Sequence, residues 1–354
     1  MKKTAQSTYD AIIIGTGPGG ATVARELSLK GKRVLMAEAG SMPEIKGTGL
    51  QTLPVMRLKP TVDDTAVVWQ VATGGATFSY CATAIDPPFD LFDKYDVDLR
   101  DEVAEAKKEL PIGPLSDYLI GPMAERIMEA AQDVGYDWHK LPKFIDQVTC
   151  RPGCWRCWYN CPYGAKWTAR KFVEEALDNG GKIINKAKVS KVLISNDKAY
   201  GIIYTQKGKS HAVFAPTVIV SAGGISTPLL LRASGIPEAG YDFFIDPLSI
   251  VVGNVKGLKG GTAEIPMATG MEVEEDGYLM TDITPTAPLY LGMAMGSLKF
   301  GKMFSGSSAL AIMIKIRDSL SGSIPEKGKI DKAMGEQENK AFNAGYEKAG
   351  EEHI

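Results

Sequence analysis

The stretch YDAIIIGTGPGG, residues 9–20, decides the expected fold of this 354-residue chain. Its four-residue apolar run predicts a buried parallel strand, and residues 21–29 predict the helix that follows the turn. Gly15, Gly17 and Gly20 form a GxGxxG motif: the first allows a tight turn, the second lets a pyrophosphate approach the backbone, and the third lets helix and strand pack closely.

A second strand is expected over residues 33–37, and it ends at Glu38, eighteen residues after the last glycine of the motif. A carboxylate at this position accepts hydrogen bonds from the ribose hydroxyls of a dinucleotide. The N-terminus of the intervening helix offers free N–H groups and a partial positive charge to the phosphates. Because strand, turn, helix, second strand and acid follow in the required order, dinucleotide binding is favoured over a plain glycine-rich turn.

The bulk composition is that of an ordinary globular protein with two domains or one elaborated domain: 44% of the residues are apolar and the formal net charge is −2. Without a basic excess, no nucleic-acid partner is expected. No window of eighteen uninterrupted apolar residues occurs, so no membrane span is expected. The first strand begins too near Met1 to leave room for a signal peptide, which makes a cytoplasmic location the expectation.

Four of the five cysteines are clustered. Cys150, Cys154, Cys157 and Cys161 read C-x3-C-x2-C-x3-C-P, and the last three reproduce the spacing of a bacterial ferredoxin run. Because cytoplasmic thiols stay reduced, these four are predicted to be metal ligands, with a [4Fe–4S] cluster as the leading type and Cys81 as a substitute ligand. Two alternatives stay open: tetrahedral zinc, and unligated buried thiols or a disulfide pair.

Several separated segments resemble the glucose–methanol–choline (GMC) oxidoreductase family of FAD-dependent, alcohol-oxidising enzymes. They are Glu38-Ala-Gly40 at the end of the second strand, TGGAT at 73–77, and VIVSAGGISTPLLLRASGI at 218–236, which is similar to the second signature of the family. The matches run from about residue 9 to 320. The CPYGAK stretch at 161–166 is similar to a cysteine-bearing branch of the family.

The resemblance implies FAD rather than NAD as the cofactor. The glycines of the GxGxxG motif would hold the pyrophosphate, and the acid after the second strand would hold the adenosine ribose. The backbone of Val189 would face the adenine, and Gly74 and Gly75 would lie near the isoalloxazine. Ala222 and Gly223 would return the chain to the FAD pocket.

The expected fold class is α/β, with three parts. A Rossmann-like FAD-binding domain is assembled from residues 1–100 and 165–240. A helical and cysteine-rich insertion occupies 101–164. An antiparallel-sheet substrate domain occupies 241–354 and is expected to be truncated.

The expected function is that of a dehydrogenase that oxidises a small-molecule alcohol, such as a sugar or polyol, by hydride transfer to flavin. Electrons would then leave through the metal cluster to an electron-acceptor protein. One rival is an NAD(P)-linked oxidoreductase, which the second signature and the 73–77 turn disfavour. The other rival is a non-catalytic electron-transfer or scaffold subunit of a split flavoenzyme.

The histidine that GMC enzymes carry near their C-terminus has no counterpart here. The chain ends in EEHI, and its histidines, His139, His211 and His353, are each expected to be exposed or structural. Asp246 stands where relatives usually have a His-Pro step. No catalytic residue is therefore assigned. Two explanations stay open: a second polypeptide supplies the C-terminal catalytic segment, or the chain is a truncated product.

Overall fold

The computed structural model describes residues 8–63 and 65–351, which form two compact units. The first comprises the chain up to Ser79, Thr168–Phe244 and Leu320–Ala333; the second comprises Tyr80–Trp167, Ile245–Ser319 and the chain from Met334 onward. A separate cysteine-rich insertion is not confirmed, because residues 101–164 belong to the same unit as residues 245–319. The predicted assignment of domains to functions stays a prediction.

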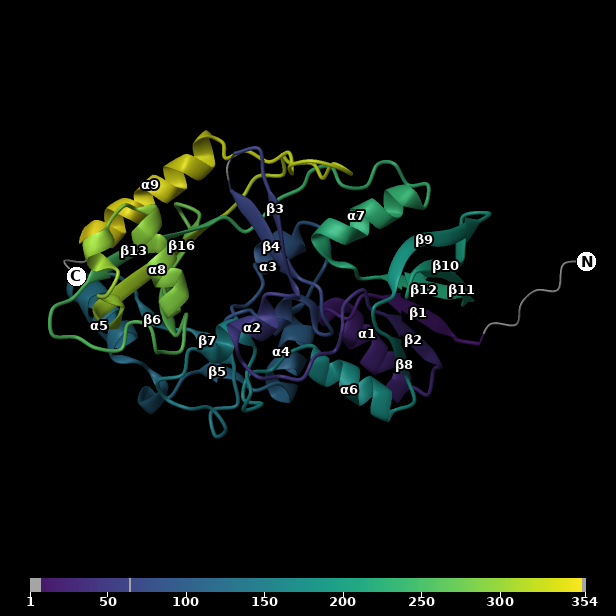
Figure 1. Cartoon of the computed structure of the whole chain (residues 1–354), viewed down its shortest axis with the longest axis horizontal. Helices are drawn as coiled ribbons and strands as arrows, with labels where there is room; N and C mark the ends of the chain where they lie inside the picture. The colour runs from purple at the N-terminus through teal and green to yellow at the C-terminus, as the bar shows by residue number, and fades with distance from the viewer. Residues whose placement is uncertain (1–7, 64, 352–354) are drawn as a thin grey trace, which may run out of the picture. The chain divides into compact units, whose positions relative to one another are not determined.

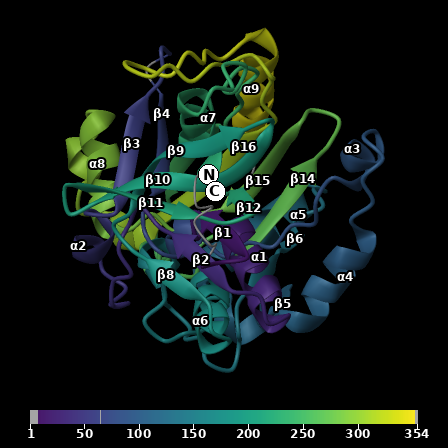
Figure 2. The ribbon, with the colours of Figure 1, turned by 90° about the vertical axis from the view of Figure 1, so that its right-hand side faces the viewer.

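A four-stranded parallel sheet forms the centre of the first unit (Figure 2). Its order is β12 (Thr217–Val220), β1 (Ala11–Ile14), β2 (Val34–Ala37), β8 (Lys182–Ile184). Every residue of β1 and β2 is buried, which explains why both strands are uninterrupted apolar runs. The helix α1 (Pro18–Leu29) connects these two strands, as the sequence predicts.

The first unit also contains two helices and an antiparallel meander. The meander consists of β9 (Lys188–Ser195), β10 (Lys198–Gln206) and β11 (Lys209–Phe214); the helices are α6 (Arg170–Asp178) and α7 (Gly223–Ala233). Helix α6 packs against α1, where Arg25 forms an ion pair with Glu175 and lies over the ring of Phe172. Helix α7 and strand β9 are neighbours (Figure 1), and Leu230 and Val192 share one hydrophobic core with Ile12 of β1.

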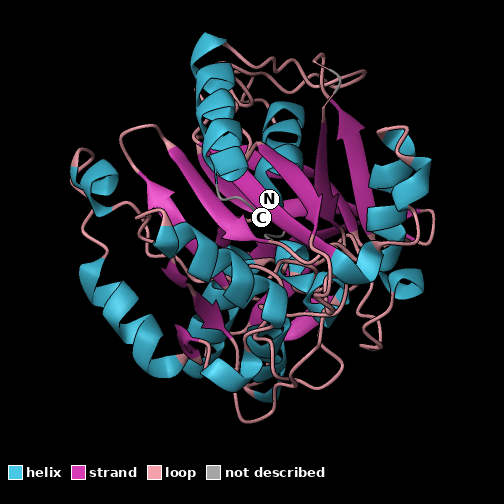
Figure 3. Ribbon diagram, turned by 90° about the vertical axis from the view of Figure 1, so that its left-hand side faces the viewer, coloured by secondary structure: helices cyan, strands magenta, loops and turns pink. Residues whose placement is uncertain are grey.

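A five-stranded antiparallel sheet forms the centre of the second unit (Figure 3). Its order is β13 (Leu248–Asn254), β16 (Ala309–Ile316), β15 (Tyr278–Asp282), β14 (Thr269–Val273), β6 (His139–Lys140). The predicted α/β fold, with an antiparallel sheet in the second half of the chain, is confirmed.

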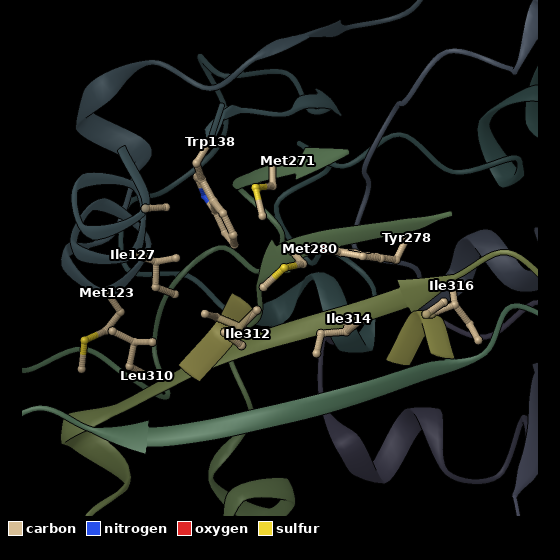
Figure 4. Close-up of a cluster of buried hydrophobic side chains, with 13 residues drawn as sticks. Met123, Ile127, Trp138, Met271, Tyr278, Met280, Leu310, Ile312, Ile314 and Ile316 are labelled. Carbon is tan, nitrogen blue, oxygen red and sulfur yellow. The ribbon is translucent and has the colours of Figure 1, made fainter. Parts of the chain in front are cut away.

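Helices α5 (Pro122–Asp133) and α9 (Glu336–Glu351) cover this sheet. The core between them is drawn in Figure 4, where Ile127 of α5 and Ile314 of β16 lie among buried methionine and isoleucine side chains. Trp138 is buried at its edge, and its Nε1 donates a hydrogen bond to Oγ1 of Thr269 over 2.8 Å. An indole can be buried here because its single donor is satisfied.

The remaining elements are short. They are α2 (Gly49–Thr52), β3 (Met56–Pro60), β4 (Ala66–Gln70), α3 (Phe89–Asp93), α4 (Arg100–Glu109), β5 (Ile112–Pro114), β7 (Pro142–Phe144) and α8 (Ala287–Gly296), with 3-10 turns at Gly75–Phe78, Asp117–Leu119, Arg156–Tyr159, Phe300–Lys302 and Gly306–Ser308. None of the described helices combines the length and the apolar character that crossing a membrane requires.

The N-terminus of α5 is capped by a carboxylate from a distant part of the chain. Glu264 accepts hydrogen bonds from the backbone N–H of Met123 (2.9 Å) and of Ala124 (3.3 Å). A Cβ on Gly121, the residue before the helix, would lie 2.1 Å from the Glu264 carboxylate, so only glycine leaves room for this cap. Burial raises the pKa of Glu264 to about 7, although the two N–H groups oppose that rise.

Because the pKa of Glu264 is raised above its unfolded value of 4.5, the folded state binds the extra proton and becomes less stable as the pH rises toward 7. We expect the free energy of unfolding to fall between pH 5 and 8, by on the order of 3 kcal/mol from this group. Glu264→Gln should flatten that dependence, whereas Glu272→Gln, at an exposed position on β14, should leave it unchanged. Urea denaturation across this pH range measures the free energy of unfolding of each variant. If that free energy changes with pH equally in the two variants, the result would contradict the assignment to Glu264.

Candidate functional site

The turn between β1 and α1 is fixed by contacts that tolerate no side chain. Gly15 has φ +93°, and a Cβ on it would lie 2.3 Å from the carbonyl oxygen of Ser221, which follows β12. A Cβ on Gly20 would lie 2.1 Å from the carbonyl oxygen of Gly15. Backbone therefore packs directly on backbone at both positions, which is the physical reason for the first and third glycines of the motif.

Gly17 differs from its two neighbours in the motif. Its φ is −66°, and a Cβ on it would meet only the Cα of Gly75, at 3.9 Å. Neither backbone strain nor packing in the chain therefore demands glycine at this position. Gly17 is the N-cap of α1 and has no side-chain cap, and Pro18 begins the helix. The first N–H groups of a helix have no acceptor within it, so this end of α1 can receive an anion.

Glu38 is buried, with 6% of its surface exposed, and it ties the end of β2 to the glycine turn. Its Oε2 accepts hydrogen bonds from the backbone N–H of Thr16 (3.0 Å) and from its Oγ1 (2.6 Å), and its Oε1 accepts one from the backbone N–H of Gly40 (2.7 Å). A carboxylate offers about four acceptor positions, and three are used here, so about one remains for a ribose hydroxyl. The predicted contact with a ribose stays a prediction.

The second glycine turn lies directly against the first. Gly74 and Gly75 both have positive φ values, +98° and +55°, and the N–H of Gly74 donates to the carbonyl oxygen of Thr16 over 3.1 Å. A Cβ on Gly75 would lie 2.7 Å from the Cα of Gly17, so glycine is required there as well.

Thr77 holds this second turn and was not singled out from the sequence. Its Oγ1 donates to the carbonyl oxygen of Gly74 over 2.5 Å and accepts from the N–H of Ala169 over 3.0 Å. The only signal for it is its place at the end of the TGGAT stretch.

Ala222 and Gly223 follow β12 and begin α7. Gly223 has φ +81°, and a Cβ on it would meet no atom within 4 Å. Val189, half-buried in β9, pairs with Tyr204 of β10. The N–H of Ala187 donates to the carbonyl oxygen of Glu38 over 2.9 Å, which joins the start of β9 to the end of β2.

The predicted cofactor residues thus share one unit, around the C-terminal ends of its parallel strands. This end of an open parallel sheet is where α/β proteins bind nucleotides. Their individual contacts with a cofactor stay predictions.

The cysteine segment lies in the second unit. Cys157 and Cys161 are buried, and Cys150 and Cys154 are half-buried. Across residues 8–63 and 65–351, no three or more His, Cys, Asp or Glu side chains form a group that could hold a metal ion. The structure therefore does not support the predicted iron–sulfur cluster or its zinc alternative.

Two buried lysines, which sequence reasoning did not select, anchor this region. The Nζ of Lys166 donates to the carbonyl oxygens of Tyr80 (3.0 Å) and Cys157 (2.9 Å). The Nζ of Lys143 donates to Oγ1 of Thr83 and to two further carbonyl oxygens. Burial lowers the pKa of both ammonium groups, that of Lys166 to about 8.

Burial acts on several thiols of this region. Burial raises the pKa of Cys81 and of Cys150 to about 12, and it also raises the pKa of Cys154 and of Cys157. Without a bound metal, the Cys81 and Cys150 thiols are therefore protonated at neutral pH, in the form that is a weak nucleophile and a weak ligand.

We assign neither of the described histidines, His139 and His211, as a catalytic base. His139 is exposed in β6, and His211 lies in the meander, where its ring stacks on Tyr204 at 5.2 Å. His353 lies outside the described residues. Asp246, at the position of the expected His-Pro step, forms an ion pair with Lys315 over 2.6 Å. No described residue is assigned as the catalytic base.

The chain is similar in sequence to a known protein family. The GMC oxidoreductase family matches residues 69–253. The chain is 28% identical to the uncharacterized GMC-type oxidoreductase Rv0492c of Mycobacterium tuberculosis, over 82% of this chain and 49% of that protein. It is 20% identical to the long-chain-alcohol oxidase FAO4A of Arabidopsis thaliana, over 96% of this chain and 52% of that protein.

Among solved structures, the chain is similar in fold to pyridoxine 4-oxidase from Mesorbium loti, with a TM-score of 0.69 at 15% sequence identity, over 97% of this chain and 80% of that one. The chain spans about half the length of the first curated relatives it matches. The family resemblance seen in the separated sequence segments is confirmed. This chain belongs to the GMC oxidoreductase family.

Proposed function

We propose that the chain is an FAD-dependent oxidoreductase that oxidises an alcohol. One observation carries the proposal. Gly17, alone among the three glycines of the GxGxxG motif, has space beside it and ordinary backbone dihedrals. A glycine that neither strain nor packing demands, at the N-terminus of a helix, fits the close approach of a pyrophosphate.

The residues of the first unit fit an FAD molecule. The N-terminus of α1 and Gly17 would hold the pyrophosphate, and Glu38 would accept hydrogen bonds from the ribose. The turn at Gly74 and Gly75 would support the flavin ring, because the absence of Cβ atoms would let the ring approach the backbone closely. Family membership supports FAD over NAD.

A bound flavin supplies the hydride acceptor, while the chain supplies binding and orientation. Glu38, buried and fixed by Thr16 and Gly40, acts as a rigid support whose position does not depend on the ligand. The proton of the alcohol needs an acceptor, which we assign to no described residue. In this proposal, a second polypeptide that carries a histidine segment would supply the proton acceptor.

An alcohol is the substrate class that the relatives favour. FAO4A, which matches 96% of this chain, is a long-chain-alcohol oxidase. A sugar or polyol is the narrower proposal from the sequence. The electron acceptor would be a separate protein in a dehydrogenase.

An electron relay through iron is a separate part of the hypothesis. Its only support is the C-x3-C-x2-C-x3-C-P spacing, because the described side chains do not form a metal site. If Cys150, Cys154, Cys157 and Cys161 bind a cluster, the protein purified without oxygen contains about four iron and four sulfide per chain. An iron content below one tenth of that stoichiometry would contradict the hypothesis of an electron relay through iron.

Gly17→Ala separates cofactor binding from folding. A methyl group fits the chain there, so the variant should fold with an unchanged Tm for the cofactor-free form, yet lose FAD because the methyl occupies the phosphate approach. Gly15→Ala is the matched contrast: its Cβ would lie 2.3 Å from a carbonyl oxygen at φ +93°, so it should lower the Tm as well. Absorbance near 450 nm gives FAD per chain, and full FAD in Gly17→Ala would contradict the site.

Oxidation of the substrate is tested by anaerobic mixing with an alcohol panel that includes long-chain primary alcohols and polyols. Loss of the flavin absorbance with an alcohol, and not with the matching carboxylate, is the expected result. Flavin that stays oxidised across the panel, in a protein that holds FAD at full stoichiometry and was purified from its host together with any polypeptide bound to it, would favour the electron-transfer or scaffold subunit instead.

A further inference from the structure

The second unit carries an exposed apolar surface on the segment that follows strand β15 in the sequence. We call it the α8 surface and define it by large apolar side chains of α8 and the turns after it: Leu289, Leu291, Met295, Leu298, Phe300 and Phe304. Phe304 is 95% exposed and Leu298 75%. Six large apolar side chains exposed within residues 289–304 exceed ordinary surface composition, and exposed apolar surface of this kind marks a contact site.

Helix α8 has no polar outer face. It contains no charged residue, and only Tyr290 and Ala294, one turn apart, are buried against the unit. A surface helix of a globular protein normally places charged residues on its outer side, as the exposed helix α4 does here. The outer side of α8 is therefore suited to an apolar environment.

The charge within the segment that carries the α8 surface has one sign. Residues 283–314 contain two charged side chains, Lys299 and Lys302, both exposed, and no acidic residue. The chain as a whole has 42 acidic and 40 basic residues, so this segment departs from the average of the molecule. Two exposed lysines in the same segment as the apolar side chains are complementary to a surface that is apolar within and anionic at its face.

A cavity of about 490 Å³ lies between α8 and the edge strand β13, which are neighbours in Figure 1. Most of its lining is apolar, including Ile250, Val252 and Met293, and Lys299 and Lys302 belong to the same lining. An anionic group bound at the two lysines would thus have apolar space beside it. This pairing is the one that an anionic lipid, with its phosphate and acyl chain, requires.

We propose that the α8 surface docks this protein onto an anionic phospholipid bilayer, without spanning it. Leu298, Phe300 and Phe304 would enter the boundary between headgroups and acyl chains, and Lys299 and Lys302 would contact the phosphates. Docking of this kind needs neither the cofactor nor an assigned substrate, so it stands independently of the proposed function. A second copy of the chain would leave four lysines facing one another without acidic partners, which disfavours self-association.

Vesicle flotation of the full chain tests the proposal, with phosphatidylcholine vesicles that contain or lack phosphatidylglycerol. The chain should float with the anionic vesicles and remain behind with the neutral ones. Leu298→Glu with Phe304→Glu should weaken binding by on the order of 100-fold, because two apolar side chains that enter the bilayer are lost. Lys299→Gln with Lys302→Gln should weaken binding to anionic vesicles by about 30-fold, since each lysine near such a surface contributes roughly 1 kcal/mol.

Two matched controls carry glutamate at equally exposed apolar positions elsewhere. Leu50 is 86% exposed and Val148 is 94% exposed, so Leu50→Glu and Val148→Glu should bind as the parent does. Loss of binding in these controls, or equal binding to neutral vesicles, would overturn the proposal. Absence of flotation together with a dimer that the Leu298→Glu, Phe304→Glu variant abolishes would also overturn it and assign the surface to a second copy. Circular dichroism and FAD content show whether each variant is folded.

Discussion

Direct packing of backbone on backbone is the constraint on which the first unit depends. At Gly15, Gly20 and Gly75 a single methyl group would lie less than 3 Å from main-chain atoms of another turn or strand. These contacts bring the end of β1, the start of α1 and the 73–77 turn to one place. Glu38 then joins the turn after β1 to the end of β2 through two hydrogen bonds from Thr16, and Gly40 donates a third that fixes the carboxylate. A carboxylate that is nearly buried can do this because each of its oxygens has N–H or O–H donors.

The fold of the first unit could be predicted because its signals are local. The apolar run at 11–14, the three glycines and Glu38 are close in sequence, and each has one steric or electrostatic reason. The antiparallel character of the second sheet was predictable from alternating runs. The strand order was not, because β6 joins β14 across more than a hundred residues. The role of Glu264 as a helix cap could not be predicted for the same reason: its partners, Met123 and Ala124, are about 140 residues distant in the sequence.

The cysteine segment shows that spacing alone does not establish a metal site. Four thiols at ferredoxin-like intervals satisfy a sequence pattern, but ligation depends on how the side chains converge, and spacing does not encode convergence. What the structure adds is a pair of buried ammonium groups, Lys143 and Lys166, bonded to carbonyl oxygens of the surrounding loops. Buried amino groups of this kind hold irregular backbone in place, since each donates to two backbone C=O groups of the loops.

The parallel sheet has a consequence for how the chain is made. Strand β1 pairs on one side with β2 and on the other with β12, where Ala11 lies opposite Thr217. During synthesis, one edge of the most apolar strand therefore stays open until about 200 further residues have been added, which takes about 10–40 s at typical rates. An open, apolar edge is a site of aggregation. A nascent chain of this protein is thus expected to need chaperone protection over that interval, and slower elongation lengthens it.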